Sequence, residues 1–431
     1  LEEQRKSIIS HAVTKGLNPN APMKDSGVEW LGDVPEHWRI SSLKRYGYFK
    51  GGAGFPHAYQ GNTEENIPFF KVNSLSKDKR FLSSFSDFVG EETAKKLGAK
   101  IFPKNSIFFA KVGAALLLER IRTNQQPCCI DNNMMGFVIQ NELSFDFAFY
   151  LMSLIDFKYL VNPGAVPSIN ESQISSFLIS VPPISEQTQI ANYLDTETTR
   201  IDNLIAKQEK LIELLEEQRK SIISHAVTKG LNPNAPMKDS GVEWLGEVPE
   251  HWKIGRLKNL LSINNGSDYK EFEVENSENS YPVYGSGGVF TYSSKYIYDQ
   301  ESVLLGRKGT INKPLYVTSP FWAVDTMFYS QVKQGVHGKY VYYQALGFPY
   351  DRYSSNTALP SMTQTDLLNL SVTIPLISEQ IEITQFLDNE NTMFDNLISK
   401  QKKLIEKLKE YRASIISHAV TGKIDVREFG A

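Results

Sequence analysis

The chain has only two cysteines, Cys128 and Cys129, and they are neighbours in the sequence. In an extended segment, neighbouring side chains point to opposite faces, and no histidine or further cysteine completes a metal-binding set around them. Both are therefore interpreted as reduced side chains packed in a core, not as a disulfide or a metal site. We expect no metal and no other cofactor.

The sequence also lacks long apolar runs and a dominant charge. No run of about eighteen apolar residues is present, and Leu1-Glu2-Glu3-Gln4 offers no apolar core for a signal peptide, so we expect a cytoplasmic protein outside the membrane. A formal net charge of -3 over 431 residues argues against a protein that coats nucleic acid everywhere. Residues 34–183 still carry a small excess of lysine and arginine, which permits local DNA binding.

Familiar catalytic signatures are missing. Gly306-Arg307-Lys308-Gly309-Thr310 lacks the spacing of a phosphate-binding loop, and no GxGxxG fingerprint opens a βαβ unit. The Asn/Asp-Pro-Pro-aromatic tetrapeptide of amino-methyltransferases is absent as well. Three histidines, His11, His225 and His418, recur in one helical pattern and are interpreted as structural. We therefore predict no catalytic residue.

What the sequence does contain is a long internal repeat. Residues 1–44 and 215–258 are nearly identical, and residues 184–228 align without gaps with residues 377–421. The segments between them, residues 45–183 and 259–376, share only weak similarity. One repeated frame with two divergent inserts indicates a scaffold that serves two different recognition tasks.

Each copy of the repeat contains the pattern of a long helix with recognisable ends. Ser185 and Ser378 suit the N-cap, and the glutamate that follows each serine suits the positive end of the helix dipole. Gly230 and Gly422 suit the C-terminal stops.

Residues on both helices recur at alternating steps of three and four, which is the spacing of a coiled-coil seam. The seam positions are Ile201, Ile205, Gln208, Ile212, Leu215, Arg219, Ile222 and Ala226, and then Phe394, Ile398, Gln401, Ile405, Leu408, Arg412, Ile415 and Ala419. Four leucines are expected to widen the stripes: Leu204, Leu211, Leu397 and Leu404. The polar positions match between copies and are expected to set the register of an antiparallel pair. The alternative is two amphipathic helices packed on separate domains.

The inserts read as mixed α/β domains with many short strands. β-Branched and aromatic residues predict strands at Ile67–Val72, Ile107–Val112, Ser302–Gly306 and Lys339–Tyr343. The fold class is therefore α+β: two mixed α/β domains separated by two long antiparallel coiled-coil spacer helices, with an internal pseudo-two-fold repeat. The expected parts are a partial repeat (1–33), a first domain (34–183), a central helix (184–230), a linker (231–248), a second domain (249–376), a distal helix (377–422) and a tail (423–431).

Several segments resemble one family in the same order. Gly27–Trp38 and Gly241–Trp252 resemble the entries to the target-recognition domains of Type I restriction-modification specificity subunits, and Pro182–Gln187 and Ile374–Gln380 resemble the exits into their spacer helices. Inside the second domain the likeness runs through Tyr281–Gly288, Leu304–Gly309 and Phe321–Thr326, and inside the first, more loosely, through Ile107–Gly113. The chain differs from the family's pattern at its first residue, because Leu1 corresponds to a point within a spacer helix. We therefore make no structural prediction for residues 1–14.

The resemblance implies a DNA-recognition subunit without catalysis of its own. Each domain would read one half of a bipartite double-stranded target, and the helices would set the gap. Two DNA adenine methyltransferase subunits and two restriction/motor subunits would dock on the frame. The rival hypothesis is a non-DNA assembly scaffold that binds proteins or glycans through the tyrosine-rich second domain.

Candidate DNA contacts follow from base and phosphate chemistry, in which arginine and lysine suit guanine, and asparagine suits adenine. We predict Lys71, Asn73 and Lys111 in the first domain, and Tyr292, Arg307, Lys308 and Lys313 in the second. The alternative for each basic residue is a solvated position at the tip of a hairpin. The target bases depend on loop geometry and are not predicted.

Overall fold

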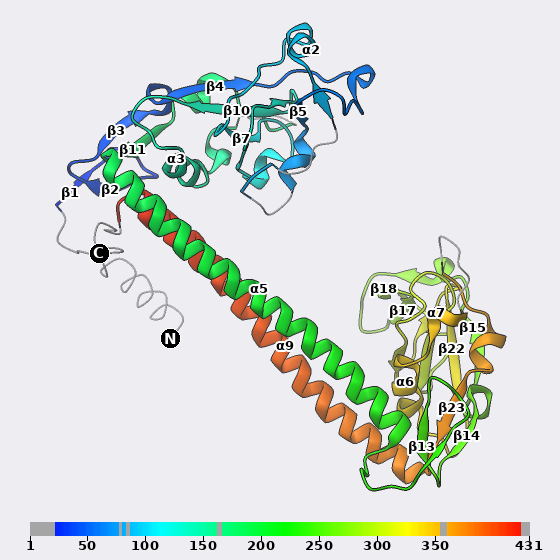
Figure 1. Ribbon diagram of the computed structural model, residues 1–431. Helices are drawn as coiled ribbons and strands as arrows, with labels where there is room; N and C mark the ends of the chain where they lie inside the picture. The colour runs from blue at the N-terminus through cyan, green and yellow to red at the C-terminus, as the bar shows by residue number, and fades with distance from the viewer. Residues whose placement is uncertain (1–21, 77–79, 83–86, 162–165, 354–359, 424–431) are drawn as a thin grey trace. The chain divides into compact units, whose positions relative to one another are not determined.

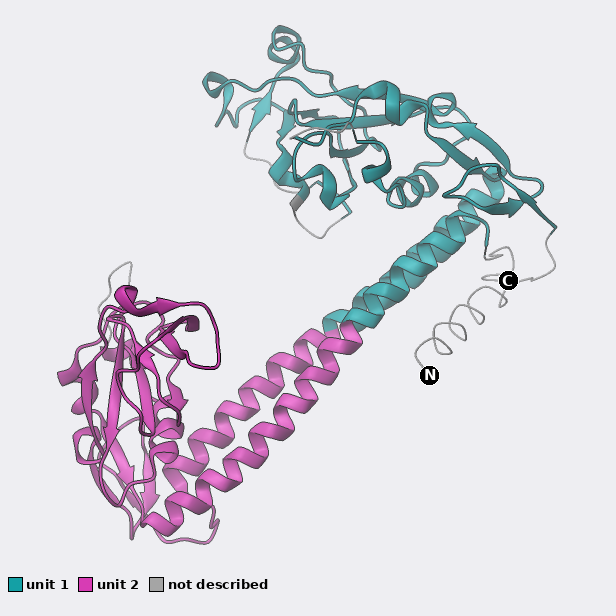
Figure 2. Cartoon of the chain, turned by 180° about the vertical axis from the view of Figure 1, so that it is seen from behind, with its two compact units in different colours: residues 1–206, 406–431 teal, residues 207–405 magenta. Residues whose placement is uncertain are grey.

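The computed structural model describes residues 22–76, 80–82, 87–161, 166–353 and 360–423. The chain divides into two compact units, residues 1–206 with 406–431 and residues 207–405, and each is described by itself (Figures 1 and 2). The expectations for residues 1–21 and 424–431 lie outside the described residues.

The first unit contains an antiparallel main sheet with strand order β4-β10-β7-β8. A second sheet has the order β6-β5-β9, in which β5 and β9 are parallel, and β3 pairs with β11. The elements are β1 (Met23–Asp25), β2 (Asp33–Pro35), β3 (Arg39–Ser42), β4 (Gly47–Gly51), β5 (Ile67–Phe70), β6 (Phe88–Val89), α2 (Glu91–Lys96), β7 (Ile107–Ala110), β8 (Arg122–Thr123), β9 (Cys129–Ile130), β10 (Met134–Ile139), α3 (Phe145–Met152), α4 (Glu171–Ser175) and β11 (Leu178–Val181).

The main sheet of the second unit repeats the strand arrangement of the first despite the different sequence. Its main sheet has the order β15-β22-β19-β20, a second sheet has the order β16-β18-β17-β21 with β17 and β21 parallel, and β14 pairs with β23. The elements are β12 (Met237–Asp239), β13 (Glu247–Pro249), β14 (Lys253–Arg256), β15 (Leu261–Asn265), β16 (Glu273–Val274), β17 (Tyr281–Gly285), β18 (Gly288–Ser293), β19 (Ser302–Gly306), β20 (Leu315–Val317), β21 (Trp322–Ala323), β22 (Met327–Val332), α6 (Gly338–Leu346), α7 (Tyr350–Tyr353), α8 (Gln364–Leu368) and β23 (Ser371–Ile374).

The α+β class is confirmed, and three of the four predicted strands are present as β5, β7 and β19. The strand predicted at Lys339–Tyr343 is wrong, because this segment lies in α6. Tyr340, Val341 and Gln344 are buried on one side of that helix, so a helical period competes with the strand propensity of the aromatic residues and prevails. Cys128 and Cys129 are buried in two different apolar clusters, as their opposite directions predict.

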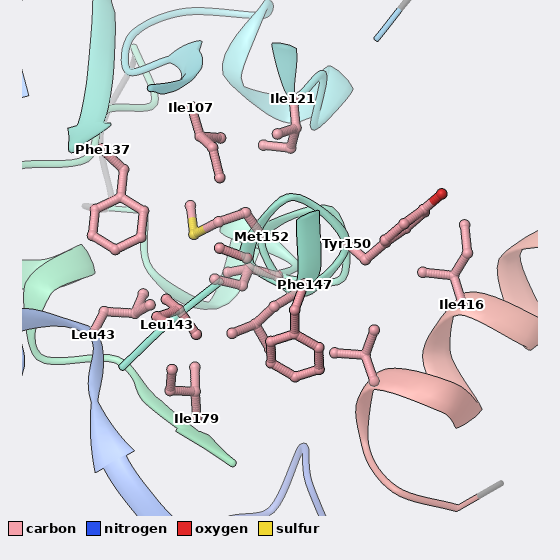
Figure 3. Close-up of a cluster of buried hydrophobic side chains, with 14 of the residues drawn as sticks. Leu43, Ile107, Ile121, Phe137, Leu143, Phe147, Tyr150, Met152, Ile179 and Ile416 are labelled. Atoms are coloured by element: carbon pink, nitrogen blue, oxygen red, sulfur yellow. The ribbon is translucent and has the colours of Figure 1, made fainter. Parts of the chain in front are cut away.

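The core of the first domain lies between its main sheet and α3. Phe137 of β10 and Phe147 of α3 are fully buried in a cluster that also includes Ile416 from the end of the last long helix. Figure 3 shows Tyr150 of α3 next to Ile416. The helix therefore contributes apolar surface to the domain core, and burial of that surface stabilises the junction.

The two long helices predicted from the repeat are α5 (Ile184–Lys229) and α9 (Ile377–Val420). Gly230 and Gly422 follow their ends, and each has a φ of 72°. This left-handed conformation favours glycine and ends a helix, so both predicted stops are confirmed.

The predicted N-caps, in contrast, are wrong. Ser185 and Ser378 lie inside the first turns of α5 and α9. The carbonyls of Pro183 and Leu376 already accept helical hydrogen bonds at 3.0 Å from the N–H groups four residues on. The helices therefore start earlier than the serines.

The glutamate after each serine connects the helix to its domain. Trp38 Nε1 donates to Glu186 Oε2 at 2.9 Å, and Trp252 Nε1 donates to Glu379 Oε1 at 3.0 Å. These tryptophans end the repeated Pro-Glu-His-Trp segments. Each repeat thus fixes the start of its helix through the same pair of residues.

Both units show the helices paired antiparallel along the predicted seam. In the first unit, Arg412 Nε, towards the end of α9, lies 2.9 Å from Asp202 Oδ1 in the first half of α5. In the second unit, Arg219 Nη2 donates to Asp395 Oδ1 at 2.5 Å. The two seam arginines therefore form equivalent interhelical ion pairs, which supports their expected effect on register.

The seam is narrower than expected. Leu204, Leu211 and Leu404, which were predicted to widen it, are 36%, 38% and 40% exposed. An antiparallel pair buries one narrow strip of each helix, and these leucines lie outside it.

Within the described residues, no helix combines the length and the apolar character needed to cross a bilayer.

Candidate nucleic-acid interface

In both domains, a basic residue directly follows the equivalent inner strand of the main sheet. β7 and β19 are buried along their whole lengths because each lies inside its sheet and is covered on both faces. The chain leaves the core where each strand ends, and the next residue is Lys111 in the first domain and Arg307 in the second.

Backbone hydrogen bonds show that Lys111 and Arg307 occupy equivalent positions. The N–H of Lys111 donates to the Asn133 carbonyl, and the N–H of Arg307 donates to the Thr326 carbonyl, both at 2.8 Å. Asn133 lies just before β10 and Thr326 just before β22, which are matching strands of the two sheets. The two basic residues are therefore held by the same part of each domain.

The turn after each basic residue is fixed in the same way. Gly113 N donates to the Pro167 carbonyl at 2.8 Å, and Gly309 N donates to the Pro360 carbonyl at 2.9 Å. Their φ values of 77° and 83° explain why glycine occupies both positions. The residue two places after each proline donates its N–H to the carbonyl of the basic residue at 3.0 Å.

The side chains of both basic residues are half-buried beside the main sheet. Lys111 Nζ lies 2.7 Å from the point that a Cβ on Gly51, the last residue of β4, would occupy. The Arg307 guanidinium lies 6.0 Å from the centre of the Phe328 ring, and Nη1 donates to the Asp325 carbonyl at 3.2 Å. Both cations are thus positioned and keep part of their surface open to solvent.

Lys71 and Asn73 lie together at the end of β5. Lys71 Nζ is 2.9 Å from Asp87 Oδ2 and donates to Gln60 Oε1 at 3.0 Å. Asn73 is exposed in a short 3-10 helix, Val72–Ser76. Because Lys71 neutralises a buried carboxylate, much of its charge is used within the domain.

Asp131 links this region to Lys111. Its carboxylate accepts the N–H of Val72 and the N–H of Asn133, both at 3.0 Å. Burial raises the pKa of Asp131, and these hydrogen bonds and the charge of Lys71 oppose that shift. The three candidates of the first domain therefore belong to one connected region.

In the second domain, Arg307, Lys308 and Lys313 lie on one segment between β19 and β20. Lys308 and Lys313 are exposed. Lys308 also forms an isolated bridge with Ser361, next to the proline that holds the turn. These three candidates therefore lie on one loop of the second domain.

Tyr292 is not part of that segment. It lies on β18, in the second sheet of the domain, and lines a groove with Glu273, Glu275 and Phe290. The two glutamates give this groove negative charge, which is unfavourable for a DNA phosphate.

Sequence reasoning missed a group of side chains beside the two basic residues. α4 and α8 begin directly after the segments that hold Lys111 and Arg307, and their first residues reach the ends of β4 and β15. The missed residues are Lys50, Gly51 and Glu171 in the first domain and Asn264, Asn265 and Gln364 in the second. A signal was present in the sequence, because residues 167–173 and 360–366 share a Pro-Ser pair followed by a capping box.

Among the described residues, no group of three or more histidine, cysteine, aspartate or glutamate side chains is arranged to hold a metal ion. The site instead consists of equivalent positions in the two domains that carry basic, amide and carboxylate groups, and such groups recognise nucleic acids by hydrogen bonding and charge.

Known proteins share both the sequence pattern and the fold. A family model described as the Type I restriction modification DNA specificity domain matches residues 35–216 and again residues 249–410. A putative type I restriction enzyme specificity subunit, MjaX, from Methanocaldococcus jannaschii is 23% identical over 92% of this chain and 96% of its own. The EcoprrI specificity subunit of Escherichia coli is 22% identical over 77% of this chain and 82% of its own.

Two solved structures have the same fold. One comes from work on complex assembly and conformational transition of the type I R-M system, with a TM-score of 0.71 and 14% identity over 91% of this chain and 99% of that one. The HsdS subunit from Thermoanaerobacter tengcongensis has a TM-score of 0.52 and 15% identity over 91% and 98%. The two family matches together span most of the chain, and this chain therefore belongs to the Type I restriction-modification DNA specificity family, whose members are recognition subunits without catalysis of their own.

Proposed function

We propose that this chain is the sequence-specific DNA-recognition subunit of a type I restriction-modification complex and that it binds a bipartite double-stranded target. One observation supports this proposal above the others. Two domains whose main sheets have the same strand order, but with different side chains beside Lys111 and Arg307, are joined to two copies of one helix. A shared frame with different surfaces suits the reading of two different half-sites.

We assign residues 34–183 and 249–376 as the two target-recognition domains, with 1–33, 184–230, 231–248, 377–422 and 423–431 as the remaining parts. The proposed DNA contacts are Lys71, Asn73 and Lys111, and Tyr292, Arg307, Lys308 and Lys313. Lys111, Arg307, Lys308 and Lys313 have the strongest support, because they lie on matching ordered segments after β7 and β19. Lys71 and Tyr292 have the weakest, since each has acidic neighbours.

We further propose that two adenine methyltransferase subunits and two restriction/motor subunits assemble on the repeated frame. The repeat supplies two copies of each helix surface, which supports two copies of each partner. Leu211 and Leu404 are matching, exposed leucines on α5 and α9, and exposed apolar surface is typical of protein interfaces. Glutamate at both positions should weaken co-purification of the methyltransferase subunit, whereas glutamate at the exposed polar positions Lys207 and Lys400 should not.

DNA binding is tested by titrating the complex with duplex DNA over a range of salt concentrations. If lysine and arginine displace counterions from phosphates, log Kd should rise linearly with log salt. The rival scaffold, which binds proteins or glycans mostly through apolar contacts, predicts little dependence on salt. Sequencing of methylated DNA from cells that carry the complex should return a motif in two parts, and a continuous motif or none would contradict the proposal.

A further inference from the structure

We infer that the side chains around the ends of β4 and β15 choose the bases of the two half-sites, whereas Lys111 and Arg307 hold the DNA backbone. The first-domain group is Lys50 with Glu171, and the second-domain group is Asn265 with Gln364. This inference rests on the proposed function, because it concerns how the same two domains read DNA.

Strand pairing shows that the two groups are equivalent. Gly51, the last residue of β4, pairs with Met135, and Asn265, the last residue of β15, pairs with Phe328. Met135 and Phe328 are the second residues of β10 and β22, which hold the same place in the two sheets. Lys50 and Gly51 therefore correspond to Asn264 and Asn265.

The helices that reach these strands are equivalent too. Asn170 and Thr363 each cap a short helix and form a capping box with the residue three places on. The first residue of each helix, Glu171 or Gln364, then extends to the edge strand. Glu171 Oε1 accepts the N–H of Gly51 at 2.9 Å, and Gln364 Nε2 donates to Asn265 Oδ1 at 3.4 Å.

The chemistry of the two groups differs. In the first domain, Lys50 Nζ lies 3.5 Å from Glu171 Oε1, and the Lys111 ammonium lies beside Gly51, so the group is formed by charged side chains. In the second domain, Asn265 and Gln364 are both neutral amides.

This difference determines which residues can discriminate between sequences. A positive charge at the same position of both domains cannot tell two half-sites apart, but it suits a phosphate, which every sequence carries. Positions that carry a charged side chain in one domain and an amide in the other can distinguish the two half-sites. Amides bind adenine at N6 and N7, lysine donates to guanine, and glutamate accepts from cytosine N4. The first-domain group therefore favours a G·C pair, and the second-domain group favours an A·T pair.

The test exchanges the helix-start residues, with Gln364→Glu in the second domain and Glu171→Gln in the first. Both changes preserve side-chain shape, and a glutamate at the start of α8 is compatible with the helix dipole. Gln334→Glu is the matched control, because it adds the same charge to an exposed position after β22, at the opposite end of these strands. Each variant is assembled with the methyltransferase subunit, and its methylated motif is determined by sequencing.

Gln364→Glu should change one base position of one half-site and lower binding of the original target by roughly 5- to 150-fold, which corresponds to the loss of one good base contact. Glu171→Gln should change one position of the other half-site only, and Gln334→Glu should change neither. Arg307→Ala and Lys111→Ala should weaken binding to all sequences evenly and reduce the salt slope by about one.

Two results would overturn the inference: an unchanged motif with Gln364→Glu and Glu171→Gln, or a relaxed single base position with Arg307→Ala. Failure of the proposed function has a different signature, because the unmodified complex would then show no two-part motif and no salt dependence. If the unmodified complex shows a two-part motif and both exchange variants keep that motif unaltered, this inference is wrong and the proposed function still holds.

Discussion

Thr373 joins three elements of the second domain through one buried hydroxyl. Its Oγ1 donates to the Val227 carbonyl at 2.7 Å and lies 2.9 Å from the hydroxyl of Tyr340. Gln344 Nε2 also donates to the Thr373 carbonyl at 2.8 Å. The end of α5, the helix α6 and the strand β23 therefore meet at a hydrogen-bonded point inside an otherwise apolar junction.

Thr373→Val should lower the free energy of unfolding by about 1 to 3 kcal/mol, because the Val227 carbonyl and the Tyr340 hydroxyl would lose a buried partner. Urea denaturation of the full chain, followed by tryptophan fluorescence, measures the change; Trp252 is buried in the cluster at the same junction and reports on it. Thr318→Val, at an exposed position, is the control. Equal effects of the two variants would show that the buried hydroxyl contributes no stability.

The paired helices depend on two interhelical ion pairs that differ in exposure. The Arg219 side chain is 26% exposed and its partner Asp395 is 72% exposed, whereas Arg412 and Asp202 are 39% and 55% exposed. Arg219 also lies 5.7 Å from the centre of the buried Phe394 ring. The arginine of the first pair is therefore the group that is partly withdrawn from water.

Asp395→Ala should destabilise the helix pair by about 1 kcal/mol, since it leaves the partly buried Arg219 without its counter-charge. Arg219→Met should change stability by less than about 0.5 kcal/mol, because an apolar side chain packs on Phe394 and the remaining aspartate is solvated. Thermal unfolding of both variants and of the double variant measures the difference. If Arg219→Met proves the more damaging change, the ion pair itself contributes net stability.

The whole molecule consists of a frame that repeats and inserts that do not. Asp202 and Asp395, and Arg219 and Arg412, occupy matching positions of α5 and α9, and the same helix-start contacts recur at Glu186 and Glu379. The main sheets of the inserts have the same strand order, but the side chains on their surfaces differ. Recognition by one domain should therefore be independent of the other.

Replacement of residues 259–376 with the corresponding domain of a relative should change one half of the methylated motif and leave the other half unaltered. The replaced segment starts after β14 and includes β23, and the pairing of these two strands closes the domain. Replacement of residues 45–183 should change the other half only. A change of both halves in either experiment would show that the two domains do not recognise DNA separately.

Helix length should set the gap between the half-sites. One heptad lengthens a helix by about 10 Å, which is close to three base pairs at about 3.4 Å each. Deletion of residues 205–211 and 398–404 removes matched heptads and returns the seam to nearly the same face. We expect the same half-sites with a spacer shorter by about two to four base pairs, and insertion of one heptad in both helices should lengthen it equally. An unchanged spacer would exclude the helices as the ruler.

Local sequence determines the frame of this protein. The repeat, the helix ends at Gly230 and Gly422 and the antiparallel seam all follow from residue spacing, because helix periodicity and capping act within a few residues. Predictions from local sequence fail where a segment suits two structures. The composition of Lys339–Tyr343 suits a strand and its pattern of burial suits a helix, and packing against the sheet determines that it is helical. Leu204 and Leu211 are exposed for a related reason, since the width of the buried strip depends on the partner helix.

The candidate surface depends on contacts that local sequence does not contain. Lys111 and Arg307 were identifiable as basic residues after apolar strands, but their equivalence follows from hydrogen bonds to Asn133 and Thr326, which are remote in the sequence. Glu171 and Gln364 reach strands that lie 120 and 99 residues earlier in the chain. Such pairs are brought together by sheet order and by burial of β7 and β19, which are properties of the folded domain. Residue spacing alone could therefore place the basic side chains, but not the amide and carboxylate groups beside them.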